Sequence, residues 1–245
     1  QFQDKDGKMK FVWQTSWGLS SRSIGALIMA HGDNQGLILP PRIAPIQVVI
    51  IPIIKQQSAL SSSNNELQNK MKKYVYQVEQ DLKNKNIRIK TDWRDQMSIG
   101  RKFNEWELKG IPLRIEIGEK EIDQQEITLA RRDNKAKQKI KINDLVKTVE
   151  SNLLEIQNNL LIQSRKFLKE RTYQVDKYQE FKQIMSDKRG FISAYWCGNS
   201  KCEEKIKKET KASTRCLSAD QKNKMGKCIY CGKSTNQRWL FAQSY

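Results

Sequence analysis

A continuous run of mostly β-branched residues at positions 47–53, Gln-Val-Val-Ile-Ile-Pro-Ile, limits the fold more than any other stretch of this chain. A strand with one face in water alternates apolar and polar side chains, and this run does not. Such runs are typical of strands buried on both faces of a parallel sheet. The run therefore predicts an α/β unit in which helices cover the sheet.

The residues after this strand predict the rest of that sheet. Ser63 to Glu66 has the spacing of a capping box and opens a helix. The apolar stripe of this helix is Leu67, Met71, Val75, Val78 and Leu82. Alternation and glycine or proline stops then predict a strand at 87–89, a helix at 101–109 and strands at 113–118, 126–132 and 139–142, with the charged side chains of 113–118 on one face. The order β-α-β-α-β-β-β indicates a mixed sheet with helices packed on it.

The segment from Trp13 to Gly25 predicts a strand that carries chemistry. In a strand, Gln14, Ser16 and Gly18 share one face and the indoles share the other, so a small, polar face is backed by aromatic rings. An apolar helical run follows at 26–30 and stops at Pro40-Pro41.

Arg22 stands alone among uncharged residues between Gly18 and Gly25. A guanidinium there can bind a phosphate or carboxylate in a bidentate fashion and offset charge that develops during phosphoryl or acyl transfer. The alternative is a surface cap over a buried hairpin.

Residues 14–25, Gln-Thr-Ser-Trp-Gly-Leu-Ser-Ser-Arg-Ser-Ile-Gly, and 31–42, His-Gly-Asp-Asn-Gln-Gly-Leu-Ile-Leu-Pro-Pro-Arg, resemble the motif 3 region of prolyl-tRNA synthetases of the archaeal and eukaryotic type. The resemblance implies that Arg22 is the catalytic motif 3 arginine and lies against ATP, with Ser20 nearby. It also implies that Ser16, Trp17 and Gly18 form the floor beneath the bound proline.

Residues 102–118 resemble the anticodon-binding domain of the same family. Reading unstacked bases needs polar groups for base edges, aromatic rings for stacking and cations for phosphates. The candidate anticodon-binding residues are Lys102, Phe103, Glu107, Lys109, Arg114 and Glu116. The alternative is a solvated helix with Phe103 and Trp106 in the core.

The C-terminal part predicts helices and a metal site. A long helix starts near Asn143, with Leu145, Val149, Leu153, Ile156 and Leu160 on one side, and helical signal resumes from Tyr178 to a stop at Gly190. Cys197, Cys202, Cys228 and Cys231 form two pairs that can present four thiolates to structural Zn²⁺. Inert thiols and a disulfide are the alternatives, and Cys216 is left over as a free thiol. The family resemblance supports the same four ligands.

The charge of the chain indicates a polyanionic partner. It has 45 lysines and arginines against 27 acidic residues, a net charge of +18. No stretch approaches the roughly 18 consecutive apolar residues of a membrane helix. The five cysteines all lie from position 197 onward, which suits a reducing compartment rather than a disulfide-stapled secreted fold, and we expect a cytoplasmic protein.

The predicted fold class is α/β (α+β), in three parts. The resemblance implies the end of a class II antiparallel-sheet catalytic domain at 1–44, a mixed-sheet anticodon-binding domain at 45–150 and a small α/β zinc-binding domain at 151–245. The complete enzyme would ligate proline to tRNA(Pro) through prolyl-adenylate, with ATP and Mg²⁺, as a homodimer.

No segment resembles motif 1, motif 2 or the proline-specificity loop, so this chain alone is expected to be inactive. Two alternatives from other classes are a non-catalytic RNA-binding zinc protein derived from a synthetase and a structural interaction module.

Overall fold

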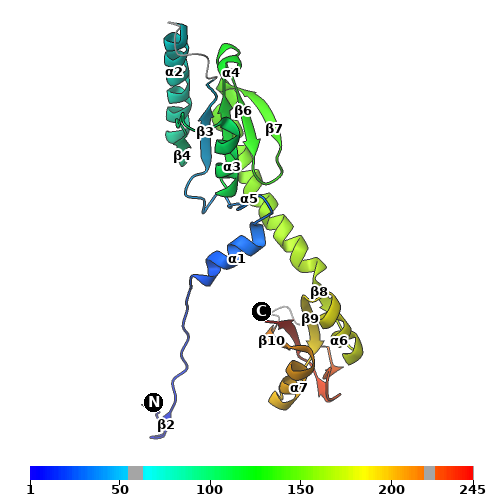
Figure 1. Ribbon diagram of the computed structural model, residues 1–245. Helices are drawn as coiled ribbons and strands as arrows, with labels where there is room; N and C mark the ends of the chain where they lie inside the picture. Colours follow the sequence, from blue (N-terminus) through cyan, green and yellow to red (C-terminus); the bar gives the residue numbers. More distant parts are fainter. Residues whose placement is uncertain (55–62, 218–223, 245) are drawn as a thin grey trace. The chain divides into compact units, whose positions relative to one another are not determined.

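A computed structural model describes residues 1–54, 63–217 and 224–244, without the side chains of 63–65 (Figure 1). The chain divides into two compact units, Gln1–Leu160 and Leu161–Tyr245. Among the described residues, no helix combines the length and apolar character needed to cross a membrane.

The first unit is built on a five-stranded sheet in the order β4-β3-β5-β6-β7. Its strands are β3 (Val48–Pro52), β4 (Ile89–Thr91), β5 (Leu113–Ile117), β6 (Glu126–Arg131) and β7 (Lys137–Lys141). β3 runs parallel to β4 and β5, whereas β6 and β7 are antiparallel to their neighbours. All five residues of β3 are buried, which confirms the predicted interior strand.

Helices cover both faces of this sheet. Val48 and Ile50 share a core with α2 (Ser63–Lys83) and α5 (Leu145–Glu170), whose predicted apolar stripes are buried from Met71 and from Leu145 onward. On the other face, Val49 and Ile51 pack with Trp106 of α3 (Ile99–Leu108). The mixed α/β sheet is confirmed. The capping box predicted at Ser63 lies outside the described side chains.

One predicted strand is shifted and one helix was not predicted, while the charged side chains of β5 share one face, as expected. The strand expected at 87–89 lies two residues later, as β4. A short helix, α4 (Glu119–Asp123), precedes β6 and was not predicted. Arg114 and Glu116 are both buried, because helix α3 covers the charged face of β5 and supplies ion-pair partners there.

The N-terminal region begins with a hairpin of β1 (Phe2–Gln3) and β2 (Met9–Lys10). Residues 11–20 lie in no helix or strand and are exposed, so the strand predicted there is wrong for this structure. A strand needs a neighbour to satisfy its backbone groups, and none of the described strands pairs with this segment. Helix α1 (Arg22–His31) follows, as expected.

The second unit has a four-stranded sheet in the order β10-β13-β9-β8. Its elements are β8 (Thr172–Gln174), α6 (Tyr178–Asp187), β9 (Phe191–Tyr195), α7 (Ser200–Thr210), β10 (Ala212–Leu217), β11 (Gly226–Lys227), β12 (Ser234–Thr235) and β13 (Arg238–Gln243). Phe181 and Phe241 are fully buried at its centre, with ring centroids 5.3 Å apart. A 3-10 helix, η1 (Ile142–Asp144), leads into α5, which spans the boundary between the two units.

Candidate functional sites

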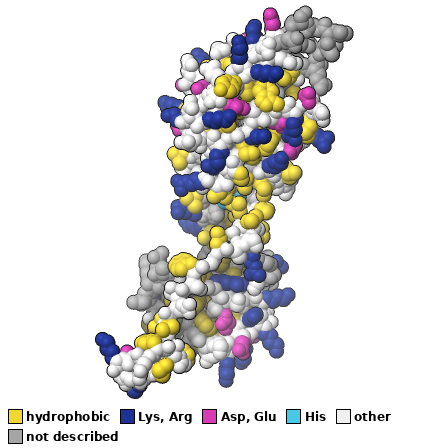
Figure 2. All heavy atoms as spheres, turned by 90° about the vertical axis from the view of Figure 1, so that its left-hand side faces the viewer, with side chains coloured by type: hydrophobic (Ala, Val, Ile, Leu, Met, Phe, Trp, Pro, Cys, Tyr) yellow, Lys and Arg dark blue, Asp and Glu magenta, His cyan; other side chains and the backbone are white. Residues whose placement is uncertain are grey.

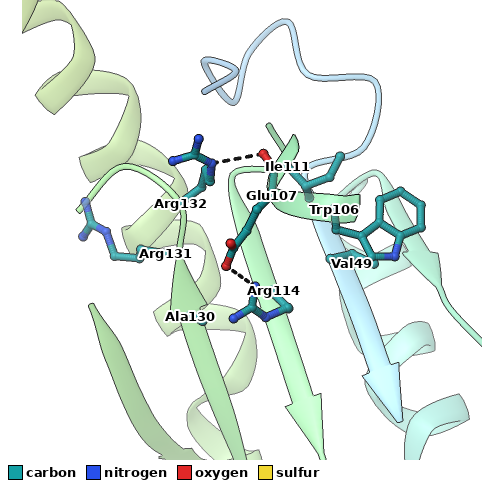
Figure 3. Close-up of a pocket in the computed structure, with 8 residues that line it drawn as sticks. All are labelled: Val49, Trp106, Glu107, Ile111, Arg114, Ala130, Arg131 and Arg132. Atoms are coloured by element: carbon teal, nitrogen blue, oxygen red, sulfur yellow. Dashed lines mark hydrogen bonds and ion pairs between the residues drawn. The ribbon is translucent and has the colours of Figure 1, made fainter. Parts of the chain in front are cut away.

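Four of the six predicted anticodon-binding residues come together between α3 and β5. The Arg114 guanidinium donates to the Glu107 carboxylate at 2.8 Å (Figure 3) and to Glu116 at 3.0 Å. Its carbon atom Cζ lies 4.0 Å from the centroid of the Phe103 ring. Arg114 and Glu116 are buried at the sheet, while Phe103 and Glu107 come from the partly exposed face of α3.

Lys137 completes this group, and the sequence reasoning missed it. Its Nζ lies 3.0 Å from Glu116 Oε1 and 5.6 Å from the Phe103 centroid. The strand register explains the contact: Arg114 pairs with Ala130, and Ala130 pairs with Lys137. The alternating lysines of β7 are visible in the sequence. Which residue Lys137 contacts, however, depends on the register between the strands. We call Phe103, Glu107, Arg114, Glu116 and Lys137 the Arg114 cluster.

The Arg114 cluster offers a ring, two cations and two carboxylates in one place. Guanidinium and carboxylate groups match the edges of guanine and cytosine, and an aromatic ring offers a stacking surface. Because these charges already pair with one another, the side chains are held in place before a ligand arrives.

The other two predicted residues, Lys102 and Lys109, lie in a separate network around Asp92. Lys102 is buried and its Nζ donates to the Asp92 carbonyl at 3.3 Å. Lys109 lies over the Trp106 ring, with Nζ 4.5 Å from the centroid. The structure therefore does not bring all six residues into one site.

Asp92 is the anionic centre of that network. Its side chain accepts hydrogen bonds from Arg94 at 2.8 and 2.7 Å and from Trp106 Nε1 at 2.8 Å. The hydrogen bonds from Arg94 are the main reason that the pKa of Asp92 lies well below its usual value, although burial opposes the shift. This arrangement anchors α3 to the end of β4.

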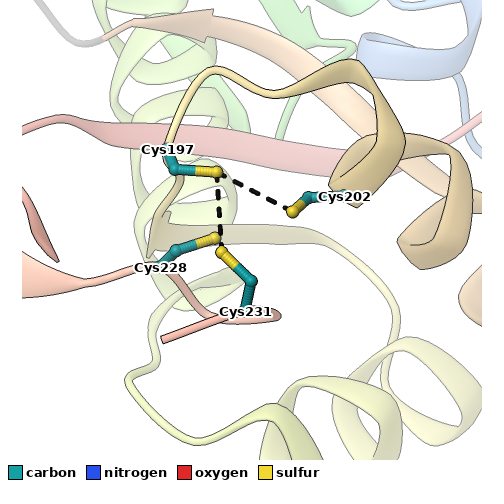
Figure 4. A group of neighbouring side chains, drawn as sticks. All are labelled: Cys197, Cys202, Cys228 and Cys231. Atoms are coloured by element: carbon teal, nitrogen blue, oxygen red, sulfur yellow. Dashed lines mark hydrogen bonds between the residues drawn. The ribbon is translucent and has the colours of Figure 1, made fainter. Parts of the chain in front are cut away.

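The four predicted cysteines converge in the second unit (Figure 4). Cys197 follows β9, Cys202 lies in α7, and Cys228 and Cys231 occupy the turn between β11 and β12. All four Sγ atoms lie within 4.8 Å of one another, and Cys197 Sγ is 3.7 Å from both Cys202 and Cys231. Four sulfurs placed tetrahedrally around Zn²⁺ at about 2.3 Å are about 3.8 Å apart, so the cluster fits the ion.

The backbone around the cysteines supports this geometry. Gly198 and Gly232 have positive φ angles of 75° and 74°, which other residues rarely adopt. The pKa of Cys231 is lowered to about 7, chiefly by a hydrogen bond from the Lys233 backbone. Burial raises the pKa of Cys202 to about 12, because its thiolate is unfavourable without a charged partner. A bound cation would stabilise that thiolate.

The predicted residues of the motif 3 region lie in an exposed part of the chain. Ser16, Trp17, Gly18 and Ser20 belong to the exposed extended segment, and Arg22 is the exposed first residue of α1. The Ser20 carbonyl accepts hydrogen bonds from the backbone and side chain of Ser23, which start the helix. None of these residues lines the pocket beside Arg114 or the one beside Trp93.

Comparison with known proteins places both clusters in one family. A family model described as "Anticodon binding domain" matches residues 47–152, and one described as "Prolyl-tRNA synthetase, C-terminal" matches residues 178–245. "Proline--tRNA ligase 2" of Bacillus cereus is 42% identical over 245 residues, which is 100% of this chain and 49% of that protein. The chain belongs to the prolyl-tRNA synthetase family.

Further relatives agree. "Proline--tRNA ligase" of Natranaerobius thermophilus is 44% identical, over 100% of this chain and 49% of its own length. The crystal structure of the prolyl-tRNA synthetase from Cryptosporidium parvum complexed with L-proline and AMP matches with a TM-score of 0.87 and 38% identity, over 100% of this chain and 50% of that one. The chain thus spans about half the length of the prolyl-tRNA synthetases it matches and corresponds to their C-terminal part.

Proposed function

We propose that this chain is the C-terminal part of an enzyme that ligates proline to tRNA(Pro) through prolyl-adenylate, at the expense of ATP with Mg²⁺. The observation that carries the proposal is the similarity to proline–tRNA ligases over the whole chain. The presence of L-proline and AMP in the related Cryptosporidium parvum structure supports ATP and proline as substrates.

Within that enzyme, Arg22 would contact ATP and stabilise charge on the transferring phosphate, with Ser20 beside it. Ser16, Trp17 and Gly18 would lie beneath the amino acid. The match of residues 14–25 to motif 3 supports these roles. The exposure of the segment supports them too, because exposed indoles such as Trp13 and Trp17 indicate a surface that another part of the enzyme covers.

The Arg114 cluster would read the anticodon of tRNA(Pro). It lies inside the residues matched by the anticodon-binding model, and its groups suit base edges and stacking. Lys109 would add a cation beside the Arg114 cluster. Lys102 would support the site indirectly, because its buried Nζ bonds to the Asp92 carbonyl and so fixes the position of α3.

The four cysteines would hold one structural Zn²⁺ ion. Four thiolates leave no coordination position for a substrate, so the ion would stabilise the second unit rather than take part in the reaction.

We further propose three domains, at 1–44, 45–150 and 151–245, in a cytoplasmic homodimer. The limits of the two family matches support the second and third domains.

The test is aminoacylation by the complete enzyme, with tRNA(Pro) and the same tRNA carrying one changed anticodon base. The proposal expects prolyl-tRNA formation that falls when the anticodon changes. Binding to both tRNAs without any aminoacylation would instead establish a non-catalytic RNA-binding protein.

A further inference from the structure

A short segment after α1 lies along the C-terminal end of α3, and we call residues 33–39 the strap. A helix end leaves its last carbonyl groups without partners inside the helix. Here the strap supplies donors: Leu37 N bonds to the Leu108 carbonyl at 3.1 Å, and Leu39 N bonds to the Gly110 carbonyl at 3.0 Å. The strap therefore pairs with the last carbonyl of α3 and with the turn that follows the helix.

Two glycines allow this close approach. A Cβ atom added to Gly36 would lie 2.6 Å from Leu108 Cα, and one added to Gly110 would lie 2.6 Å from Leu37 Cβ. Both glycines also have positive φ angles. The backbone of the strap thus packs directly against the backbone at the end of α3. We therefore expect a displacement of one to displace the other.

An ion pair fixes the same junction from the sheet side. Arg132, directly after β6, donates to both carboxylate oxygens of Asp33, at 2.9 and 2.6 Å. Its Nε also donates to the Glu107 carbonyl at 3.1 Å (Figure 3). The Arg132 side chain is only 4% exposed, whereas that of Asp33 is 35% exposed, so the guanidinium is buried and the carboxylate reaches it from the surface.

Glu107 connects this junction to the Arg114 cluster. Its backbone is held by Arg132, and its carboxylate accepts from Arg114 at 2.8 Å. We propose that Asp33 and Arg132 are positioning residues for anticodon recognition: Asp33 orients the Arg132 guanidinium, which fixes Glu107 and through it Arg114. This inference rests on the anticodon-reading role proposed above.

Asp33 belongs to the segment that resembles motif 3, far along the chain from the residues that would touch the anticodon. Its substitution should nevertheless change the choice of tRNA more than the activation of proline, because its contacts lead to α3.

The experiment compares the complete enzyme with Asp33→Asn, Arg132→Lys and the double variant. Three quantities are measured: the ratio of aminoacylation kcat/KM for tRNA(Pro) to that for an anticodon variant, tRNA-independent pyrophosphate exchange with proline, and Tm. Each single variant should lower the ratio by roughly 10-fold, with exchange within about twofold of wild type. The double variant should lose no more than the larger single effect, because both residues act through one contact.

Arg131→Gln is the matched control. Arg131 is the neighbour of Arg132 and also forms a bidentate pair, with Asp133, but its other contacts are Asn152 and Glu155 of α5. This control should lower Tm and leave the ratio unchanged.

An unchanged ratio in Asp33→Asn and Arg132→Lys would overturn the inference. So would an equal loss in Arg131→Gln, or a parallel fall in pyrophosphate exchange, since either would indicate general destabilisation. A wild-type enzyme that ignores the anticodon would remove the proposed anticodon-reading role, and this inference with it.

Discussion

The guanidinium of Arg114 lies directly over the ring of Phe103, with Cζ 4.0 Å from the ring centroid. Two carboxylates, of Glu107 and Glu116, form ion pairs with the same guanidinium. A planar cation can stack and form bidentate hydrogen bonds at once, and an ammonium group cannot. The arrangement therefore depends on arginine itself, not only on its charge.

Arg114→Lys tests this dependence. The charge is kept while the stacking and the second carboxylate contact are lost, so discrimination between tRNA(Pro) and an anticodon variant should fall by roughly 10-fold. Aminoacylation kinetics of the complete enzyme measure it. Arg101→Lys, on the exposed surface of the same helix, is the control and should discriminate as wild type does.

Removal of the proposed zinc should loosen the second unit first. Metal analysis of freshly purified protein should give about one zinc per chain, and a chelator should lower the unfolding temperature of residues 161–245. Cys202→Ser should abolish the metal. Cys216→Ser should keep it, because Cys216 is exposed and lies outside the four-cysteine cluster. Protein that contains almost no zinc, and ignores the chelator, would contradict the assignment.

Arg22→Ala should slow adenylate formation in the complete enzyme. Loss of a preorganised charge beside a transferring phosphate costs on the order of 10²-fold in rate. Pyrophosphate exchange measures this step. Binding of tRNA should be unaffected, because Arg22 is separate from the Arg114 cluster. Exchange at the wild-type rate would instead assign Arg22 to the start of α1 alone.

Asp92 should make the first unit sensitive to acid. Its pKa in the folded protein is lowered, so its contribution to stability is present above its unfolded pKa of about 3.9 and is lost as pH falls below that value. Asp92→Asn should destabilise the unit by about 3 kcal/mol at neutral pH, and the difference from wild type should shrink below about pH 4. Urea unfolding at several pH values checks this. Asp123→Asn, at an exposed position, should leave the profile unchanged.

The isolated chain should bind tRNA(Pro) without activating proline. Its net charge of +18 favours phosphate contacts, and affinity should fall as salt rises with a log–log slope of about −0.7 per contacted phosphate on single-stranded RNA. Filter binding at several salt concentrations, beside pyrophosphate exchange, measures both properties. Measurable exchange would show that the upstream half is not needed.

Features set by local periodicity could be predicted from the sequence. The buried strand β3 and the apolar stripe of α5 follow from the order of apolar residues alone, and the cysteine spacing indicated its cluster. Features set by distant partners could not. The contact of Lys137 with Glu116 depends on strand register, and the orientation of Lys102 depends on the Asp92 end of β4. The strand predicted near Ser16 is absent because none of the described strands pairs with that segment, and alternation within the segment cannot supply a partner.

The strap also affects which residue should be the first in a fragment that contains only the five-stranded sheet and its helices. The family match starts at residue 47, but the donors for the Leu108 and Gly110 carbonyls come from Leu37 and Leu39. A fragment cut at residue 45 would lose both donors and the carboxylate partner of Arg132, whereas one that begins at Asp33 keeps them. The choice of cloning boundary therefore determines whether the end of α3 retains its native hydrogen bonds.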